Sequence, residues 1–193
     1  MTVHFLAIRG EAEQQGDVTL TDATPSISVN EHRAAAKEVV RCAVLTLSDT
    51  RTSETDTSGA FIRQALDWAD FEVVDYQVQP DEPAKITAIL STWAGRSDVD
   101  AILTNGGTGI AHRDSTYDAI SSLLEKRLDG FGELFRMLSY EQIGAAAMLS
   151  RAIAGSIGDT IVISMPGSSN AVRLAMEKLV LPELRHLVFE LRK

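Results

Sequence analysis

Cysteine, positive charge and long apolar runs are all scarce in this chain of 193 residues. A single cysteine, Cys42, excludes an internal disulfide framework and a zinc site built on several thiolates. Only 18 Lys and Arg residues stand against 27 Asp and Glu residues, which gives a formal net charge of −9. This deficit argues against nucleic acid and anionic membrane surfaces as partners, because both are recognised by basic patches.

The chain also lacks any apolar run near the roughly 18 residues that a membrane-spanning helix needs. Its apolar start, Met1–Ile8, has neither the basic lead-in nor the small-residue cleavage site of a secretory signal. Hydrophobic residues nevertheless make up 45% of the sequence, which is enough for a packed core. We therefore expect a folded protein of the cytoplasm.

Residues 1–38 differ in composition from the rest of the chain. Between residues 10 and 37 there is no aromatic side chain, and the few apolar positions follow no sustained helical period. Many of the remaining positions are Thr, Ser, Asp and Gln, a composition typical of segments without a core of their own. We expect a mobile N-terminal arm over residues 1–38, followed by one domain over residues 39–193. Within the arm, Met1–Ile8 is a candidate for a docking strand.

From Val39 onward, strand-like and helix-like patterns alternate. Residues 39–47 form a near-continuous apolar run, which is typical of a strand buried on both faces. Ser58 is placed to cap the helix after the first polar loop. The predicted order is strand 39–47, helix 58–69, strand 71–78, helix 86–93, strand 101–104, helices 118–124 and 133–149, strands 152–157 and 160–164, and helix 170–187. We interpret Glu125–Arg127 as a solvated helix end, and Trp68 and Trp93 as packing residues.

This alternation, with its short connecting loops, predicts an α/β fold. The expected architecture is a three-layer, doubly wound, mostly parallel sheet with helices on both faces. Sheets of this kind bind ligands outside the carboxyl ends of their strands, at the point where the strand order reverses. The loops that follow the strands are therefore where we expect a functional site.

The most informative of these loops is rich in glycine and follows the strand 101–104. Its residues are Gly106, Gly107, Thr108 and Gly109, and the three glycines leave room for backbone N–H groups to approach a ligand. The next residues bring a cation, a carboxylate and hydroxyl groups to the start of a helix: Arg113, Asp114, Ser115 and Thr116. This pattern predicts an anion site that depends on backbone N–H groups and a helix dipole. A purely structural glycine turn is the alternative.

A second loop of similar character precedes the last predicted helix. It reads Pro166, Gly167, Ser168, Ser169 and Asn170. Glycine followed by hydroxyl side chains and a helix indicates a cradle for a phosphate or a pterin. An ordinary helix N-cap is the alternative.

Carboxylates also gather where strands are predicted to end. Asp49, which follows Ser48, and Asp81 lie at or just past the carboxyl end of a strand, as does Asp114. An isolated Asp in a loop usually serves a turn. Three that converge are suited to hold Mg²⁺ and, through it, phosphate oxygens.

Five short motifs occur in an order and spacing that resemble one known family. They are Thr46–Asp49, Pro80–Glu82, Thr104–Gly109 continued by Arg113 and Asp114, Gly130–Glu133, and Met165–Ser168. Over about residues 40–190 they resemble the MoaB/MogA family of molybdenum cofactor biosynthesis proteins. The stretch Gly130–Arg151 is similar to the MoaB branch.

The resemblance implies a molybdopterin-binding α/β fold that assembles as a homotrimer or homohexamer. The apolar stretch Phe131–Leu149, which is long for one helical face, also favours assembly. The implied reaction transfers AMP from Mg-ATP to the terminal phosphate of molybdopterin and releases pyrophosphate. Because the adenylylated product is the substrate for metal insertion, the molybdenum insertase of the pathway is a candidate partner.

Residue by residue, Asp81 and Asp114 match the family's two functional aspartates, and Asp49 matches its first-loop aspartate. We expect Asp114 to position Mg²⁺ or phosphate and Asp81 to orient the reacting groups, with Mg²⁺ bound by either carboxylate. The residues predicted to bind substrate, from the loops and the resemblance together, are Ser48, Asp49, Gly106, Gly107, Thr108, Gly109, Arg113, Thr116, Pro166, Gly167, Ser168 and Ser169.

The chain departs from the family pattern at Asn105, at Tyr117 and at the pair Ser169–Asn170. A basic residue is common in the family at the last of these positions, so one expected phosphate contact is missing. A non-catalytic molybdopterin-binding or scaffold protein is therefore the alternative to an adenylyltransferase. An unrelated nucleotide-binding α/β protein is a third interpretation.

Overall fold

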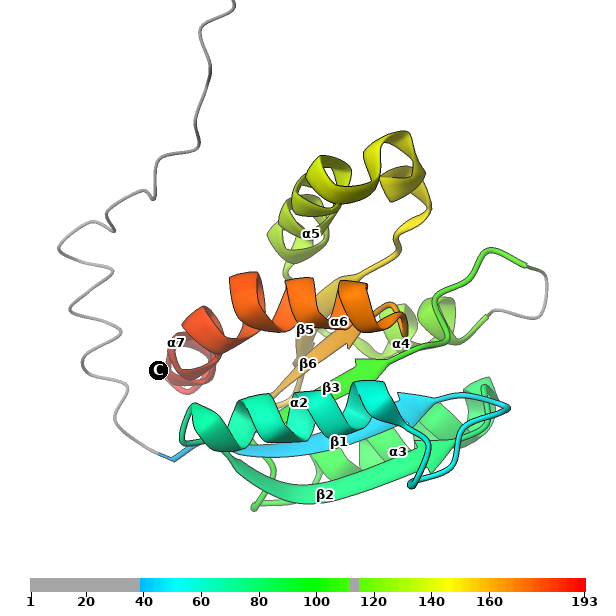
Figure 1. Ribbon diagram of the computed structural model, residues 1–193. Helices are drawn as coiled ribbons and strands as arrows, with labels where there is room; N and C mark the ends of the chain where they lie inside the picture. Colours follow the sequence, from blue (N-terminus) through cyan, green and yellow to red (C-terminus); the bar gives the residue numbers. More distant parts are fainter. Residues whose placement is uncertain (1–38, 112–114) are drawn as a thin grey trace, which may run out of the picture.

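The computed structural model describes residues 39–111 and 115–193, so the predicted arm over residues 1–38 lies outside the described residues. Six strands form one sheet in the order β2-β1-β3-β6-β5-β4 (Figure 1). Their bounds are β1 Arg41–Leu47, β2 Glu72–Gln79, β3 Ala101–Asn105, β4 Lys126–Arg127, β5 Ile153–Ile157 and β6 Thr160–Met165. Strands β2, β1, β3 and β6 are parallel, whereas β5 pairs antiparallel with both β6 and β4. The predicted doubly wound, mostly parallel sheet is confirmed.

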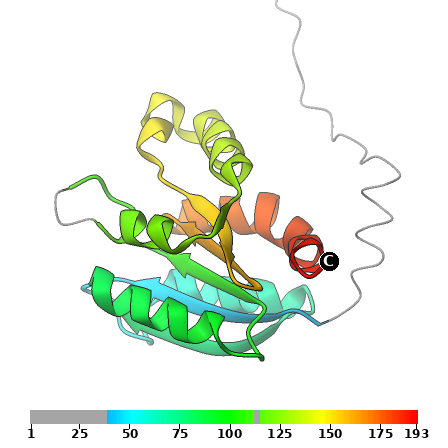
Figure 2. The same cartoon turned by 180° about the vertical axis from the view of Figure 1, so that it is seen from behind.

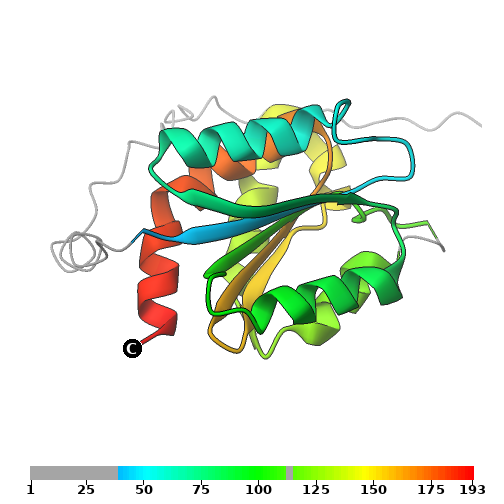
Figure 3. The same cartoon turned by 90° about the horizontal axis from the view of Figure 1, so that it is seen from below.

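Helices cover both faces of this sheet and complete the three predicted layers (Figure 3). One face carries α2 Thr57–Trp68, α5 Asp129–Ile143, α6 Ser169–Ala175 and α7 Leu181–Leu191. The other carries α3 Pro83–Ala94 and α4 Thr116–Leu123, which are in front when the molecule is seen from behind (Figure 2). Among the described residues, no helix combines the length and the apolar character that crossing a bilayer requires.

Alternate residues of the central strands supply two separate cores. Cys42 and Val44 of β1 pack in the core beneath α2, and burial raises the pKa of the Cys42 thiol. Ala43 and Leu45 point to the opposite face and pack in the core beneath α3. Because both faces of the strand are covered, the sequence of β1 shows no alternation between polar and apolar residues.

Two predictions about α2, its N-cap residue and the packing of Trp68, are wrong. The helix is capped by Asp56, whose Oδ1 accepts the Gly59 N–H at 3.0 Å, and not by Ser58. Trp68 does not pack, since it is 75% exposed, whereas Trp93 is buried as predicted. Trp68 lies two positions after the buried Leu66, which turns it by about 200° around the helix axis and away from the sheet.

Two corrections concern the segment between residues 125 and 149. Lys126 and Arg127 form the short strand β4 instead of a helix end, and they pair with β5 where Gly155 leaves room. A Cβ atom at Gly155 would lie 2.1 Å from the Lys126 carbonyl oxygen. Helix α5 ends at Ile143 because Gly144 has φ 59°, and residues Gly144–Leu149 continue as the 3₁₀ helix η1.

The end of the chain follows the prediction with one difference. The hairpin of β5 and β6 around Gly158 is confirmed. The single predicted helix over residues 170–187 is divided into α6, the π-helical turn η2 over Met176–Val180, and α7. Pro182 follows the turn and has no N–H to donate, so the α-helical bonding pattern cannot run unbroken through it.

Candidate functional site

The loops after β1, β2, β3 and β6 lie together, because these four strands are parallel and their carboxyl ends share one edge of the sheet. This edge is the right-hand side of Figure 1. The chain leaves β1 for β2 on one side and reaches β3 on the other, so the strand order reverses between β1 and β3. A ligand site is expected at that point in sheets of this kind.

The glycine loop after β3 and the loop after β6 meet backbone to backbone. The Gly106 N–H donates to the Met165 carbonyl at 3.0 Å. A Cβ atom at Gly167 would lie 3.0 Å from the Gly106 Cα atom, and one at Gly106 would lie 2.2 Å from the Leu47 carbonyl oxygen. Gly106 and Gly107 also have positive φ angles of 99° and 63°. Glycine is therefore required here by close approach and by backbone conformation.

Two of the predicted carboxylates adjoin the glycine loop. Asp49 Oδ1 accepts the Asp81 N–H at 3.1 Å, which joins the loops after β1 and β2. Asp81 Oδ1 lies 3.0 Å from where a Gly107 Cβ atom would be, and the Thr116 Cβ atom lies 3.2 Å from the same point. The structure thus brings Asp49, Asp81, Gly107 and Thr116 together.

Unpartnered polar atoms are concentrated at this edge. Among the described residues, six buried side-chain polar atoms have no hydrogen-bond partner. Five of them are at the carboxyl ends of the strands, in the loops beyond or, for Thr116, at the start of α4. These five are Asp81 Oδ1, Thr104 Oγ1, Asn105 Oδ1, Thr116 Oγ1 and Ser164 Oγ. Because most buried polar groups in proteins are paired, a cluster of unpaired ones marks a region built for something other than stability.

The carboxylate of Asp56 organises the loop after β1. It is buried, and it accepts hydrogen bonds from the Gly59 N–H at 3.0 Å and the Tyr76 hydroxyl at 2.8 Å, with Arg51 Nη1 at 3.4 Å. Burial alone would raise the pKa of Asp56, but hydrogen bonds from Gly59, Thr46 and Tyr76, together with Arg51, hold it below its usual value. Burial and the bond to Asp56 raise the pKa of Tyr76 to about 12.

Arg51 connects the Asp56 network to the loop after β6. Its Nη2 lies 3.4 Å from the Gly167 carbonyl oxygen, to which the Ser58 hydroxyl also donates at 3.1 Å. Arg51 was not among the residues predicted from the sequence. The signal was its place in a polar loop after a buried strand, but its partner lies 116 positions away in the chain.

The remaining predicted residues fall into four groups. Ser48 Oγ accepts the Arg51 N–H at 3.2 Å and Ser168 Oγ accepts the Ala171 N–H at 3.3 Å, so these hydroxyls form a turn and a helix cap in this structure. Thr108 is buried and Ser169 is exposed. Gly109 and Pro166 lie in the two loops that meet. Arg113 and Asp114 lie outside the described residues.

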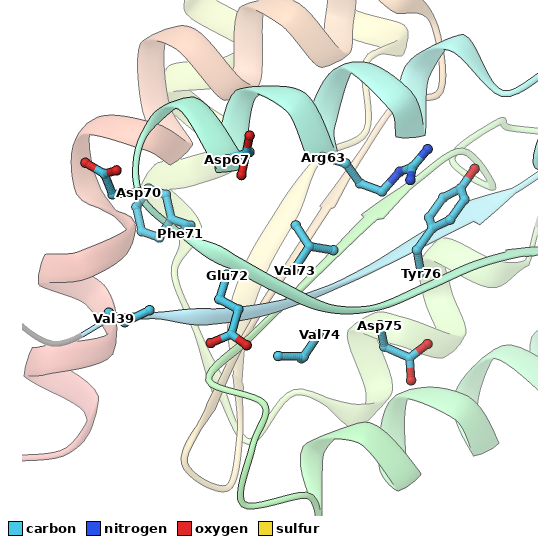
Figure 4. Close-up of a pocket in the computed structure, with 10 residues that line it drawn as sticks. All are labelled: Val39, Arg63, Asp67, Asp70, Phe71, Glu72, Val73, Val74, Asp75 and Tyr76. Carbon is cyan, nitrogen blue, oxygen red and sulfur yellow. The ribbon is translucent and has the colours of Figure 1, made fainter.

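A groove at the edge strand β2 has a different chemistry (Figure 4). Its volume is about 840 Å³, and it runs along the first half of β2 beneath α2. Its charged lining residues are Arg63, Asp67, Asp70, Glu72 and Asp75. Arg63 stacks on Tyr76 and Asp75 pairs with Arg96 at 2.6 Å. A lining with four carboxylates and one arginine does not suit a phosphate, so the groove is not our candidate site.

The carboxyl edge of the sheet fits a Mg²⁺ ion that is bound partly by the protein and partly by the substrate, and not one that is enclosed by protein side chains alone. No three His, Cys, Asp or Glu side chains gather around a common point within the part of the chain that the structure describes. Mg²⁺ in enzymes that act on phosphates is usually held by one or two carboxylates and by the substrate. The unpartnered Asp81 Oδ1, with Asp49 beside it, fits that donor set.

Comparison with known proteins identifies a family that this chain resembles over most of its length. A family model described as "Probable molybdopterin binding domain" matches residues 43–186. The chain is 54% identical over 168 residues to molybdenum cofactor biosynthesis protein B of Bacillus cereus. The matched region covers 86% of this chain and 99% of the relative.

Solved structures extend the likeness to the fold. A crystal structure of a molybdenum cofactor biosynthesis protein B is 54% identical, with a TM-score of 0.78 over 80% of this chain and 97% of that one. The tungsten cofactor synthesizing protein MoaB from Pyrococcus furiosus is 36% identical, with a TM-score of 0.73 over 81% of this chain and 99% of that one.

Proposed function

This chain belongs to the molybdopterin-binding family of molybdenum cofactor biosynthesis proteins, and on that basis we propose that its strand-end loops bind molybdopterin and transfer AMP to it from Mg-ATP. The observation that carries the proposal is the meeting of Gly106 with Gly167 beside the unpartnered carboxylate oxygen of Asp81. It joins backbone donors from two loops and a carboxylate at the point where the strand order reverses.

In the proposed reaction, an oxygen of the terminal phosphate of molybdopterin forms a bond to the α-phosphorus of ATP. The bond between the α-phosphorus and the bridging oxygen breaks, and pyrophosphate leaves. The attacking phosphate is largely ionised at neutral pH, so no strong general base is needed. The protein's task is therefore to align the two phosphates and to offset their charge.

Each part of the edge has a role in that alignment. Backbone N–H groups of Gly107–Gly109 and Gly167–Ser169 bind the pterin and the phosphates, while Gly106 and Pro166 shape the two loops. Arg51 supplies positive charge from the loop after β1, with Arg113 as a second cation. Asp81 orients the reacting groups, and Asp114 positions phosphate. Asp49, Asp81 and Asp114 would hold Mg²⁺, which supplies charge neutralisation on the ATP phosphates when bound.

An adenylylation assay tests this proposal. Wild-type protein incubated with molybdopterin and Mg-ATP is expected to release adenylylated molybdopterin and pyrophosphate in equal amounts. Asp81→Asn and Asp114→Asn should each lower the rate about 100-fold or more. Asp159→Asn, in the exposed turn between β5 and β6, is the matched control and should leave the rate unchanged. Folded wild-type protein with no turnover above background contradicts the catalytic proposal.

A non-catalytic molybdopterin-binding or scaffold protein is the second candidate. It is favoured by the exposed Ser169 and Asn170, which place no charge at the start of α6. Calorimetry separates the two candidates, because an adenylyltransferase must bind both molybdopterin and Mg-ATP. Molybdopterin binding without Mg-ATP binding favours the second candidate.

We also propose that the protein works in the cytoplasm as a homotrimer or homohexamer, with the molybdenum insertase of the pathway as a partner. Exposed apolar side chains gather on α5 and η1: Leu134, Met137, Tyr140, Ile143, Met148 and Leu149.

Light scattering should report an oligomer for the wild type, and Met148→Glu should weaken the association of its subunits. Trp68→Glu is the matched control, because Trp68 and Met148 are 75% and 76% exposed. A wild-type monomer at micromolar concentration contradicts assembly.

A further inference from the structure

Arg151 lies between η1 and β5, and its side chain reaches the glycine loop from outside the strand-end loops. Its Nε donates to the Thr108 carbonyl at 3.0 Å. Its Nη2 donates to the carbonyl of the next residue, Gly109. One guanidinium group therefore holds two successive carbonyls of the loop.

The first turn of α4 holds Arg151 in turn. The guanidinium carbon lies 4.4 Å from the centre of the Tyr117 ring, and Nη1 lies 3.3 Å from Asp118 Oδ2. The Tyr117 N–H donates to the Gly107 carbonyl at 3.2 Å, so α4 and the glycine loop are also joined directly. The arginine side chain is only 23% exposed. Stacking fixes the plane of the guanidinium fork, which decides where its N–H groups point.

Holding these carbonyls also sets the direction of the loop's N–H groups. In a trans peptide unit, the C=O and the N–H point in opposite directions. When Arg151 holds the Thr108 and Gly109 carbonyls, the N–H groups of Gly109 and Ile110 point away from Arg151. Glycine-rich backbone would otherwise sample several orientations. A loop that is already fixed loses less conformational entropy when it binds a ligand.

We propose that Arg151 is a positioning residue that keeps the glycine loop in the form that binds the phosphate-bearing ligand, and that Tyr117 keeps Arg151 in place. Arg151 acts through the loop backbone and does not touch the reacting atoms. The prediction for turnover rests on the proposed function. The prediction for loop order in the ligand-free protein does not.

Amide hydrogen exchange in the ligand-free protein tests loop order. In Arg151→Gln, a peptide spanning residues 105–111 should exchange about tenfold faster, the equivalent of about one net hydrogen bond. Tyr117→Leu should give a smaller increase, and Tyr117→Phe, which keeps the ring face, should give none. Arg151→Lys keeps the charge but loses the fork, so it should resemble Arg151→Gln. Arg127→Gln, on the exposed strand β4, is the matched control.

Calorimetry with molybdopterin and the adenylylation assay test the effect on the ligand. Arg151→Gln should bind molybdopterin about tenfold more weakly, and its KM for molybdopterin should rise by a similar factor with kcat little changed. If Arg151→Gln does not fold, Arg151→Lys and Tyr117→Leu carry the same test.

The outcomes separate the positioning role from the proposed function. Unchanged exchange over residues 105–111 in folded variants overturns the inference. Faster exchange with unchanged affinity for molybdopterin overturns the part that concerns the ligand. Faster exchange with weaker binding, in a protein whose wild type does not adenylylate molybdopterin, supports the positioning role and contradicts the proposed reaction.

Discussion

The amino and carboxyl ends of the central strands treat their buried polar groups in opposite ways. At the amino end of β3, Asp100 is 1% exposed and accepts the Arg41 N–H at 2.7 Å, the Arg41 Nε at 3.0 Å, and further bonds from Arg41 Nη2 and Arg192. At the carboxyl end, buried atoms of Asp81, Asn105 and other residues have no partner among the described residues. The first end joins β1, β3 and the end of α7, whereas the second leaves donors and acceptors for a ligand.

The difference teaches how one sheet divides two tasks. Removing a buried carboxylate that is fully paired leaves its arginines without a partner and destabilises the fold. A buried polar atom that is left unpaired costs stability in the free protein and gains its partner when a ligand binds. Variants at the carboxyl end should therefore affect binding and turnover, and variants at the amino end should affect stability.

Among the variants considered, Gly106→Ala should have the largest effect on molybdopterin binding at the carboxyl end. Its Cβ atom would lie 2.2 Å from the Leu47 carbonyl oxygen, at a φ of 99°, so the two loops must move apart. We expect molybdopterin affinity to fall more than 100-fold in calorimetry, together with a lower unfolding free energy. Gly130→Ala is the matched control, because nothing lies within 4 Å of a Cβ atom there. Wild-type affinity in Gly106→Ala excludes the glycine loop as the binding site.

Asp100→Asn should show the reverse behaviour. Breaking a buried ion pair typically costs about 3–5 kcal/mol, and we expect a loss near the lower end because an amide of the same shape remains. Urea unfolding measures this loss, while the adenylylation rate per folded molecule should stay at the wild-type value. The control is Asp98→Asn, since the Asp98 side chain is 51% exposed. A large fall in turnover at wild-type stability contradicts the division of tasks.

Arg51→Gln should weaken binding more than folding. The Arg51 side chain is 30% exposed, and its guanidinium is held by Asp56 and reaches the loop after β6. Its removal therefore takes away a cation and a contact between loops. We expect molybdopterin to bind about tenfold more weakly and with less dependence on salt concentration. Arg51→Lys keeps the charge and should retain the salt dependence. Equal affinity in Arg51→Gln and wild type removes Arg51 from the site.

The smallest expected effect is the response to pH at the amino end. Burial alone would raise the pKa of Asp100, but hydrogen bonds from Arg41 and Arg192 hold it below its ordinary value. The stability contributed by this carboxylate is therefore complete above its ordinary pKa of about 3.9 and is lost as the pH falls through the lower pKa of the folded state. Unfolding free energies measured from pH 5 to pH 3 should fall less steeply in Asp100→Asn than in wild type. Parallel slopes contradict this assignment.

Local features of the sequence were sufficient to predict much of the site. The glycine loop and Asp81 directly follow strands whose apolar patterns are clear, and parallel strands bring their ends to one edge. Asn105, the last residue of β3, also has a local structural role. Its Nδ2 donates to Thr46 Oγ1 at 2.8 Å, across to β1.

Other features depend on contacts that distant parts of the chain make. Arg51 and Arg151 bind backbone carbonyls 116 and 42–43 positions away, and no local pattern marks a side chain for such a contact. Asp and Ser are both common helix N-caps, so the sequence does not distinguish Asp56 from Ser58. Asp56 is the cap in the structure, where it also accepts a buried hydrogen bond from Tyr76 of β2. Strand β4 has two residues, which is too short for any periodicity.

One measurement tests the central claim most directly: amide hydrogen exchange with and without bound molybdopterin. The account predicts that molybdopterin slows exchange in peptides covering residues 48–51, 105–109 and 166–169. Exchange over residues 70–76, which line part of the groove at β2, should not change. Slower exchange confined to residues 70–76, or no change at the carboxyl edge when the ligand is bound, would contradict the account.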